Sequence, residues 1–166
     1  MSIISFFKDA GEKLFGGKET APAAAAPSQA DLDARSAQAN ETAARAIEKY
    51  IAAQSLTADG LSVEFDGATS TVTVAGVAAD QATHEKIVLC CGNVTGVAQV
   101  ADLMTVAEPA DESQYHTVVR GDTLSAIAKK FYGNANAYMK IFEANKPMLS
   151  NPDKIYPGQL LRVPKA

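Results

Sequence analysis

Two short stretches in the middle of the chain alternate between apolar and polar residues, as half-buried β-strands do. Residues 61–65 and 71–76 show this pattern, and Asp66-Gly67 between them supplies turn chemistry. The pattern therefore predicts a β-hairpin. Its inward-facing side chains should be Leu61, Val63, Phe65, Val72 and Val74.

Apolar residues at helical spacing precede and follow this hairpin. Residues 28–53 predict one helix, and Ser28 stands three residues before Asp31, the spacing of a capping box. Residues 81–91 predict a second helix that covers the hairpin, and residues 98–106 predict a third strand. The expected order is helix, strand, strand, helix, strand, with both helices on one face of the sheet. The covering side chains of the second helix should be Ile87, Val88 and Cys91.

The start of the chain carries a separate amphipathic pattern. Residues 2–15 place Lys, Asp and Glu on one side of a helix that Gly16-Gly17 ends, and residues 18–27 form an Ala/Pro linker. Such a short helix is marginal alone, so it should dock on the following domain or on a membrane surface. Its polar side balances Lys against acidic residues, which argues against the membrane. The apolar side consists of Ile3, Phe7, Ala10 and Leu14, with Phe6 beside them.

A second unit follows an acidic stretch at residues 108–114. Residues 115–119 predict a strand, and Thr123 is placed to cap the helix that follows it. Gly133-Asn134 should break that helix before a second one, and residues 159–163 predict a closing strand. The fold class is therefore α+β with two small domains, divided into residues 1–17, 18–27, 28–107, 108–114 and 115–166. The sequence leaves open whether the two units pack together.

The composition and charge of the chain argue against several classes of function. The 166 residues carry a formal net charge of -4 with a pI near 5.1, which argues against nucleic-acid binding. No basic region precedes the apolar residues 1–7 and no stretch is long enough to cross a bilayer, so we expect a cytoplasmic monomer. Cys90 and Cys91 are adjacent and have no partner cluster, so we expect small buried hydrophobes rather than a disulfide or a zinc site.

The connection at residues 91–97 is the candidate for chemistry. Gly92 and Gly96 stand where the second helix must end and reverse, and glycine adopts the positive φ that such an end uses. The last carbonyls of a helix lack partners and lie at the negative end of its dipole. The residues are therefore consistent with a plain helix cap, and also with a turn whose carbonyls hold a cation.

Both units resemble known families. The second resembles a LysM domain, through Gly121-Asp122-Thr123-Leu124, Asn145 and the closing Ile155-Tyr156-Pro157-Gly158-Gln159. The first looks like a BON domain, through Val72-Thr-Val-Ala-Gly76 and Gly92-Asn93-Val94-Thr95-Gly96-Val97. Headed by the amphipathic residues 6–14, the arrangement resembles the Kbp-like family of bacterial cytoplasmic potassium-binding proteins. The chain departs from that family in its longer Ala/Pro linker and in Cys90-Cys91.

The resemblance implies a K⁺ site and no catalysis. K⁺ is a large, weakly hydrated ion whose water a ring of neutral carbonyls can replace, whereas small divalent ions would require carboxylates. Binding would order the first helix on the BON-like unit. The main-chain carbonyls that the resemblance implies are those of Phe7, Ala10, Gly92, Val94, Val97 and Gln99.

Two other functions remain as alternatives. LysM domains commonly bind N-acetylglucosamine polymers such as peptidoglycan, in a shallow groove beside the first helix. An enzyme is disfavoured, because His84 and His116 lie in separate units without a partnered nucleophile and no Gly-rich phosphate loop follows a strand. The residues that the LysM resemblance implies for a glycan are Gly121, Asp122, Thr123, Leu124, Asn151, Pro152, Asp153 and Ile155.

Overall fold

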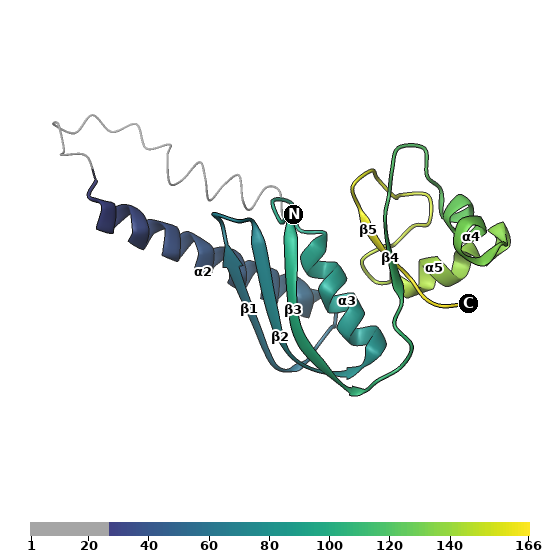
Figure 1. The fold of residues 1–166 in the computed structure, drawn as a ribbon, viewed down its shortest axis with the longest axis horizontal. Helices are drawn as coiled ribbons and strands as arrows, with labels where there is room; N and C mark the ends of the chain where they lie inside the picture. Colours follow the sequence, from purple (N-terminus) through teal and green to yellow (C-terminus); the bar gives the residue numbers. More distant parts are fainter. Residues whose placement is uncertain (1–26) are drawn as a thin grey trace.

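The computed structural model describes residues 27–166, which form two α+β units in sequence (Figure 1). The predicted first helix, most of the Ala/Pro linker, and the candidate ligands Phe7 and Ala10 lie outside the described residues. The elements of the first unit are α2 (Gln29–Ala53), β1 (Asp59–Asp66), β2 (Thr71–Asp80), α3 (Gln81–Gly92) and β3 (Gln99–Glu108). Those of the second are β4 (Gln114–Thr117), α4 (Leu124–Tyr132), the 3-10 turn η1 (Ala135–Ala137), α5 (Tyr138–Ala144) and β5 (Leu160–Val163).

The first unit contains a three-stranded sheet in the order β1-β2-β3. β1 runs antiparallel to β2 through the predicted hairpin, with Val63 opposite Val74. β3 runs parallel to β2, because α3 carries the chain back across the sheet before β3 begins. Both α2 and α3 lie on one face of the sheet, as expected (Figure 1).

The long helix α2 begins as its sequence predicts. The Ser28 hydroxyl accepts a hydrogen bond from the Asp31 amide at 3.2 Å, and the Asp31 carboxylate accepts one from the Ser28 amide at 3.1 Å. These are the two halves of a capping box, which satisfies amides that the first turn leaves free. The side-chain and backbone hydrogen bonds from Ser28 also lower the pKa of Asp31.

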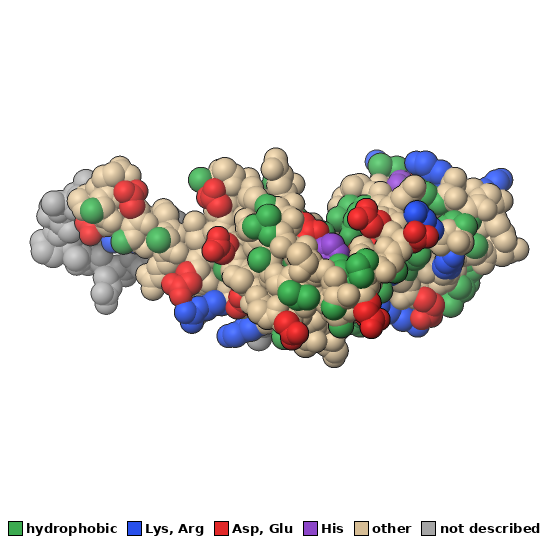
Figure 2. All heavy atoms as spheres, turned by 60° about the horizontal axis from the view of Figure 1, so that its bottom comes forward, with side chains coloured by type: hydrophobic (Ala, Val, Ile, Leu, Met, Phe, Trp, Pro, Cys, Tyr) green, Lys and Arg blue, Asp and Glu red, His purple; other side chains and the backbone are tan. Residues whose placement is uncertain are grey.

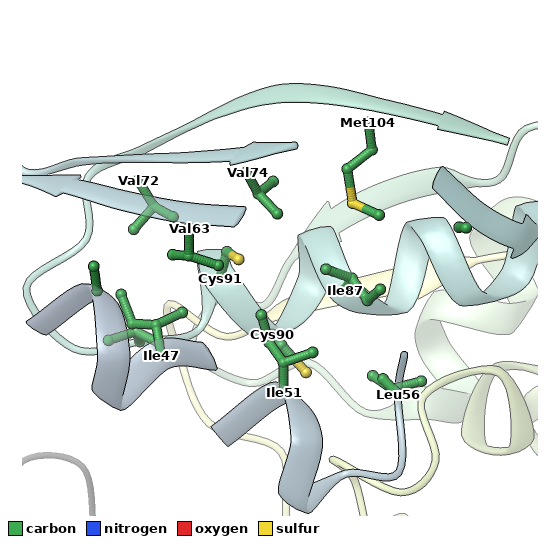
Figure 3. Close-up of a cluster of buried hydrophobic side chains, with 13 residues drawn as sticks. Ile47, Ile51, Leu56, Val63, Val72, Val74, Ile87, Cys90, Cys91 and Met104 are labelled. Carbon is green, nitrogen blue, oxygen red and sulfur yellow. The ribbon is translucent and has the colours of Figure 1, made fainter. Parts of the chain in front are cut away.

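The core of the first unit lies between the sheet and its two helices. Figure 3 shows side chains of α3 lying between those of the strands and those of α2. The expectation that Val88 covers the sheet is wrong: Val88 is only half-buried and lies outside this core, because residues 87, 90 and 91 occupy the facing side of the helix. Leu61 and Phe65 are only partly buried. The fully enclosed side chains include Ile47, Ile51, Val72, Val74, Ile87, Cys90 and Cys91.

Both cysteines are therefore small buried hydrophobes, as expected. Neither is exposed to solvent, and burial raises the pKa of each thiol to about 12. Neither takes part in a disulfide. Unreactive protonated thiols follow from this environment.

The second unit packs two short helices against a two-stranded antiparallel sheet, β4-β5. The Thr123 hydroxyl caps α4 by accepting a hydrogen bond from the Ala126 amide at 3.1 Å. Gly133 ends that helix with a φ of 69°, a left-handed conformation that glycine adopts without strain. The predicted capped turn and helix break are thus confirmed. The core includes Leu124, Ile127, Ala128, Ile141, Phe142, Leu161 and Val163.

The two units pack together, which the sequence left open. Helix α3 contacts the sheet of its own unit on one side and β5 of the second unit on another (Figure 1). Leu89 on α3 is only 1% exposed although it belongs to neither core. Between residues 27 and 166, no helix combines the length and the apolar character needed to cross a bilayer.

Candidate functional site

The candidate turn joins the end of α3 to the start of β3. Its geometry corrects one expectation, because α3 does not end at a left-handed glycine. Gly92 is the last residue of the helix, and Asn93 follows as the cap with a φ of -92°. The left-handed glycine is Gly96, with a φ of 92°. Gly92 instead lies against the second unit, where a Cβ would make a tight contact of 3.1 Å with Leu160 Cδ2.

The four described candidate ligands all belong to this one connection. Gly92, Val94, Val97 and Gln99 fall within eight residues, and the Val94 carbonyl accepts a hydrogen bond from the Val97 amide at 3.1 Å. The Val94 side chain is 2% exposed and Val97 packs against the same core, so both fix the backbone of the turn. These four positions therefore lie on one short segment whose backbone is held by packing.

The electrostatics of the turn favour a cation. The last turn of α3 contains no basic residue to offset the negative end of the helix dipole. None of the four positions supplies a carboxylate. Within residues 27–166, no three His, Cys, Asp or Glu side chains gather as a metal site would require. Main-chain oxygens are thus the groups that this turn offers a cation.

Hydrogen bonds anchor the turn at both ends. At one end, the Ala98 amide donates to the Ser70 carbonyl of the β1–β2 hairpin at 2.8 Å. At the other, the Asn93 side chain pairs twice with the backbone of β5. Its Nδ2 donates to the Leu160 carbonyl at 3.0 Å, and its Oδ1 accepts from the Leu160 amide at 2.7 Å. A turn held this way loses little conformational entropy on binding an ion.

Glu85 is the centre of a buried polar cluster between the two units. Its carboxylate accepts hydrogen bonds from the Ser113 amide at 2.7 Å, from Gln81 Nε2 at 3.0 Å and from the Arg162 guanidinium. Asn145 in turn holds the Arg162 backbone, with its Oδ1 and Nδ2 each 2.8 Å from the amide and the carbonyl. Helix α3, the connecting segment and β5 therefore meet at one satisfied network.

Because of this network, the free energy of unfolding should depend on pH in the acid range. Burial alone raises the pKa of Glu85, but the hydrogen bonds from Ser113, Arg162 and Gln81 outweigh it, and the pKa lies below its usual 4.5. A carboxyl whose folded pKa is depressed stabilises the fold above its unfolded pKa, and this contribution is lost as pH falls through the folded pKa. We expect stability to decrease below about pH 4.5, and to do so less steeply in Glu85→Gln. Urea unfolding across pH 2–6 measures both slopes; equal slopes would exclude this role of Glu85.

Each histidine pairs with one carboxylate of its own unit. His84 Nε2 lies 2.7 Å from Asp102 Oδ2, and His116 Nε2 lies 2.8 Å from Asp122 Oδ2. Asp122 also accepts a hydrogen bond from the Val119 amide at 3.0 Å, which closes the turn before α4. The hydrogen bond from His116 lowers the pKa of Asp122. Each pair satisfies one ring nitrogen, whereas Nδ1 of His84 is buried without a hydrogen-bond partner in the described part of the chain.

A shallow groove of about 370 Å³ lies beside α4 in the second unit. Two predicted glycan residues are not part of its lining. Gly121 shapes the preceding turn with a φ of 92°, and the Asn151 side chain closes its loop by accepting from the Asp153 amide at 2.9 Å. The other six line the groove together with Ser125 and Tyr138: Asp122, Thr123, Leu124, Pro152, Asp153 and Ile155.

Sequence reasoning missed Asn93, Glu85 and Arg162. Asparagine is common at the end of a helix, so Asn93 gave no sign of a distant partner. A signal was present in α3, where residues 87–91 are five consecutive apolar residues. A helix that is covered on only one face has apolar residues at every third or fourth position, not in a continuous run. The run therefore indicates that α3 is buried on two sides.

Comparison with known proteins agrees with this architecture. The BON domain family matches residues 37–108, and the LysM domain family matches residues 116–164. The potassium binding protein Kbp of Escherichia coli O6:H1 is 43% identical over 166 residues, covering 99% of each chain. An uncharacterized protein of Deinococcus radiodurans is 39% identical over 75 residues, 43% of this chain and 29% of that protein. An endolysin of Bacillus phage B103 is 33% identical over 70 residues, 42% of this chain and 25% of that protein. Because the Kbp match extends over the whole length of both proteins, the chain belongs to the Kbp family and consists of a BON domain followed by a LysM domain.

Proposed function

We propose that this chain is a cytoplasmic K⁺-binding protein and not an enzyme. The ion is held by the main-chain carbonyls of Phe7 and Ala10 together with those of Gly92, Val94, Val97 and Gln99. The observation that carries the proposal is the turn after α3, where four of these positions share one anchored connection at the negative end of a helix. The near-complete match to a protein named for potassium binding supports the same ligand.

The charge distribution of the chain favours a cation at this place. Residues 28–107 contain four basic and ten acidic residues, a net charge of -6, whereas residues 115–166 contain eight and three, a net charge of +5. Figure 2 shows the blue Lys and Arg side chains mainly over the LysM domain. The field around the BON domain is therefore negative, which raises the local concentration of cations.

The chain is long enough for the first helix to reach the turn. Asn40 of α2 accepts a hydrogen bond from the Gly67 amide, and the same hairpin holds the Ala98 amide, so the turn lies level with Asn40. Asn40 lies twelve positions after Ser28 along α2, about 18 Å. Residues 18–27 can span up to about 35 Å, and residues 11–15 of the predicted helix add about 7 Å. A cage that combines Phe7 and Ala10 with the turn is within reach.

Binding would couple K⁺ to the order of the N-terminal segment. The complete cage exists only when the first helix lies against the BON domain, so K⁺ stabilises that arrangement by mass action. This makes the protein a sensor or buffer of the ion rather than a catalyst. Neutral carbonyls set its preference for a large monovalent ion over Mg²⁺.

Calorimetry tests the proposal. Titration of the full chain with K⁺ should give a saturable heat, and Na⁺ or Mg²⁺ at the same ionic strength should give none. Deletion of residues 1–15 should abolish the K⁺ heat while the thermal melt in Na⁺ still shows a folded protein. Equal heats for K⁺ and Na⁺, or none for K⁺, would reject K⁺ binding.

The groove of the LysM domain supports a second candidate function. It gathers six of the eight residues expected to contact a glycan, in a hollow of about 370 Å³. Binding of N-acetylglucosamine polymers is the alternative that this groove fits. Cosedimentation with insoluble peptidoglycan, combined with the absence of a K⁺ heat, would reverse the order of the two candidates.

A further inference from the structure

Within residues 27–166, no helix covers one face of the BON sheet, and β2 and β3 place no charged side chain on that face. Along β2, Val72, Val74 and Ala78 point into the core, so the alternate residues of that strand point to the other face. The parallel register places Ala75 beside Leu103 of β3, and these two lie at the middle of that face. We define the open face as Thr71, Thr73, Ala75, Val77 and Ala79 of β2 with Ala101, Leu103, Thr105 and Ala107 of β3.

This composition is unusual for a face that meets water. A half-buried sheet normally carries polar and charged side chains on its solvated side. None of the nine residues of the open face is charged, and its two largest side chains are hydrophobic, with Leu103 65% and Val77 41% exposed. Within the described sheet, charges border this face only on β1, where Asp59, Glu64 and Asp66 are the strand partners of Val77, Thr73 and Thr71. A face of this kind is suited to burial under another apolar surface.

The N-terminal helix has the size and the apolar side to cover it. A 14-residue helix is about 21 Å long and about 10 Å wide. Three strands spaced about 4.8 Å apart present a face of similar width. The predicted helix 2–15 collects Ile3, Phe7, Ala10 and Leu14 on one side. A single helix of this size could therefore cover the open face.

We propose that the apolar side of this helix docks on the open face of the BON sheet. The inference rests on the proposed function, because the same helix would lend the carbonyls of Phe7 and Ala10 to the ion. Leu103 lies four residues beyond Gln99 on β3, about 13 Å away. A 21 Å helix can thus contact Leu103 and the potassium turn together.

Charge and tethering favour the N-terminal helix over a second molecule of this protein as the partner of the open face. Two BON domains, each with a net charge of -6, repel one another, whereas Lys8 and Lys13 balance Asp9 and Glu12 within the helix. A tethered segment also has an effective concentration in the millimolar range, far above that of a second molecule in dilute solution. A membrane surface is disfavoured by the same balanced polar side.

The absence of tryptophan from the sequence allows a direct test. Leu103→Trp places a single tryptophan on the open face, and Leu32→Trp places one on the exposed start of α2 as the matched control. We expect the emission of Trp at position 103 to shift to longer wavelength when residues 1–15 are deleted, at every protein concentration. The emission of the control should not change. Leu103→Asp should release the segment, seen as faster proteolysis within residues 1–26.

Every other outcome overturns docking on this face. No shift at position 103, or a shift only at position 32, would place the helix elsewhere. A shift that disappears on dilution would indicate a second copy, and one that requires anionic vesicles would indicate a membrane. Measurements on the same samples in K⁺ and in Na⁺ distinguish this proposal from the proposed function. If K⁺ gives a calorimetric heat but deletion of residues 1–15 gives no emission shift, only the docking is rejected. If the deletion gives the emission shift but K⁺ gives no heat, only K⁺ binding is rejected.

Discussion

Arg162→Ala should lower the free energy of unfolding by about 3 kcal/mol, the range found when one partner of a buried ion pair is removed. The side chains of Arg162 and Glu85 are only 11% and 3% exposed, and they join β5 of the LysM domain to α3 of the BON domain. Without the guanidinium, the Glu85 carboxylate remains buried with hydrogen bonds to Ser113 and Gln81 alone. Urea unfolding of the full chain at pH 7 measures the loss.

An exposed pair in the same domain provides the control. Lys146 contacts Glu143 at 2.7 Å, but the two side chains are 45% and 56% exposed, so Lys146→Ala should cost less than about 1 kcal/mol. The double variant Glu85→Gln with Arg162→Met should regain part of the stability, because it removes both charges together. If Arg162→Ala were as mild as Lys146→Ala, the buried pair would not stabilise the contact between the domains.

Deletion of residues 16–27 should weaken K⁺ binding at least tenfold, about 1.4 kcal/mol or more. The deletion joins Phe15 directly to Ser28, which leaves Ala10 within about 8 Å of α2 if the helix is intact. The turn lies about 18 Å along α2 from Ser28, so Phe7 and Ala10 could no longer reach it. Potassium calorimetry on the shortened chain measures the effect.

A variant with a linker of unchanged length but different sequence tests whether linker length or linker composition matters for K⁺ binding. Replacing residues 18–27 by ten Gly and Ser residues keeps a mean end-to-end distance of about 17 Å, so binding should persist within a few-fold. Undiminished affinity in the deletion variant would contradict a cage shared between the N-terminal helix and the turn. Loss of affinity in the Gly/Ser variant would instead assign a specific role to the Ala/Pro sequence.

Local signals in the sequence predicted the secondary structure well. The capping box of Ser28 and Asp31, the cap at Thr123 and the break at Gly133 each depend on residues within one helical turn, and the structure confirms all three. Such caps satisfy backbone groups nearby, so they can be read without knowledge of the fold. The strand pattern of the hairpin is local in the same sense and is also confirmed.

Features that depend on distant contacts could not be predicted. Gly92 was predicted to end the helix with a positive φ, yet it lies within the helix and against Leu160, 68 positions later. The pairing of Glu85 with Arg162 had no local signal, because 77 positions separate the two residues. For the potassium site itself, main-chain carbonyls occur in every residue, so no side-chain pattern could mark them. That site was predicted only from resemblance and stays a prediction.

The position of α3 between two packing partners has a consequence for how this protein can change over generations. Glu85 and Gly92 of α3 and its cap Asn93 each contact Leu160 or Arg162 of the LysM domain. A LysM domain with an uncharged residue at the position of Arg162 would leave Glu85 buried without its counter-charge. The two modules are therefore expected to be inherited as a pair.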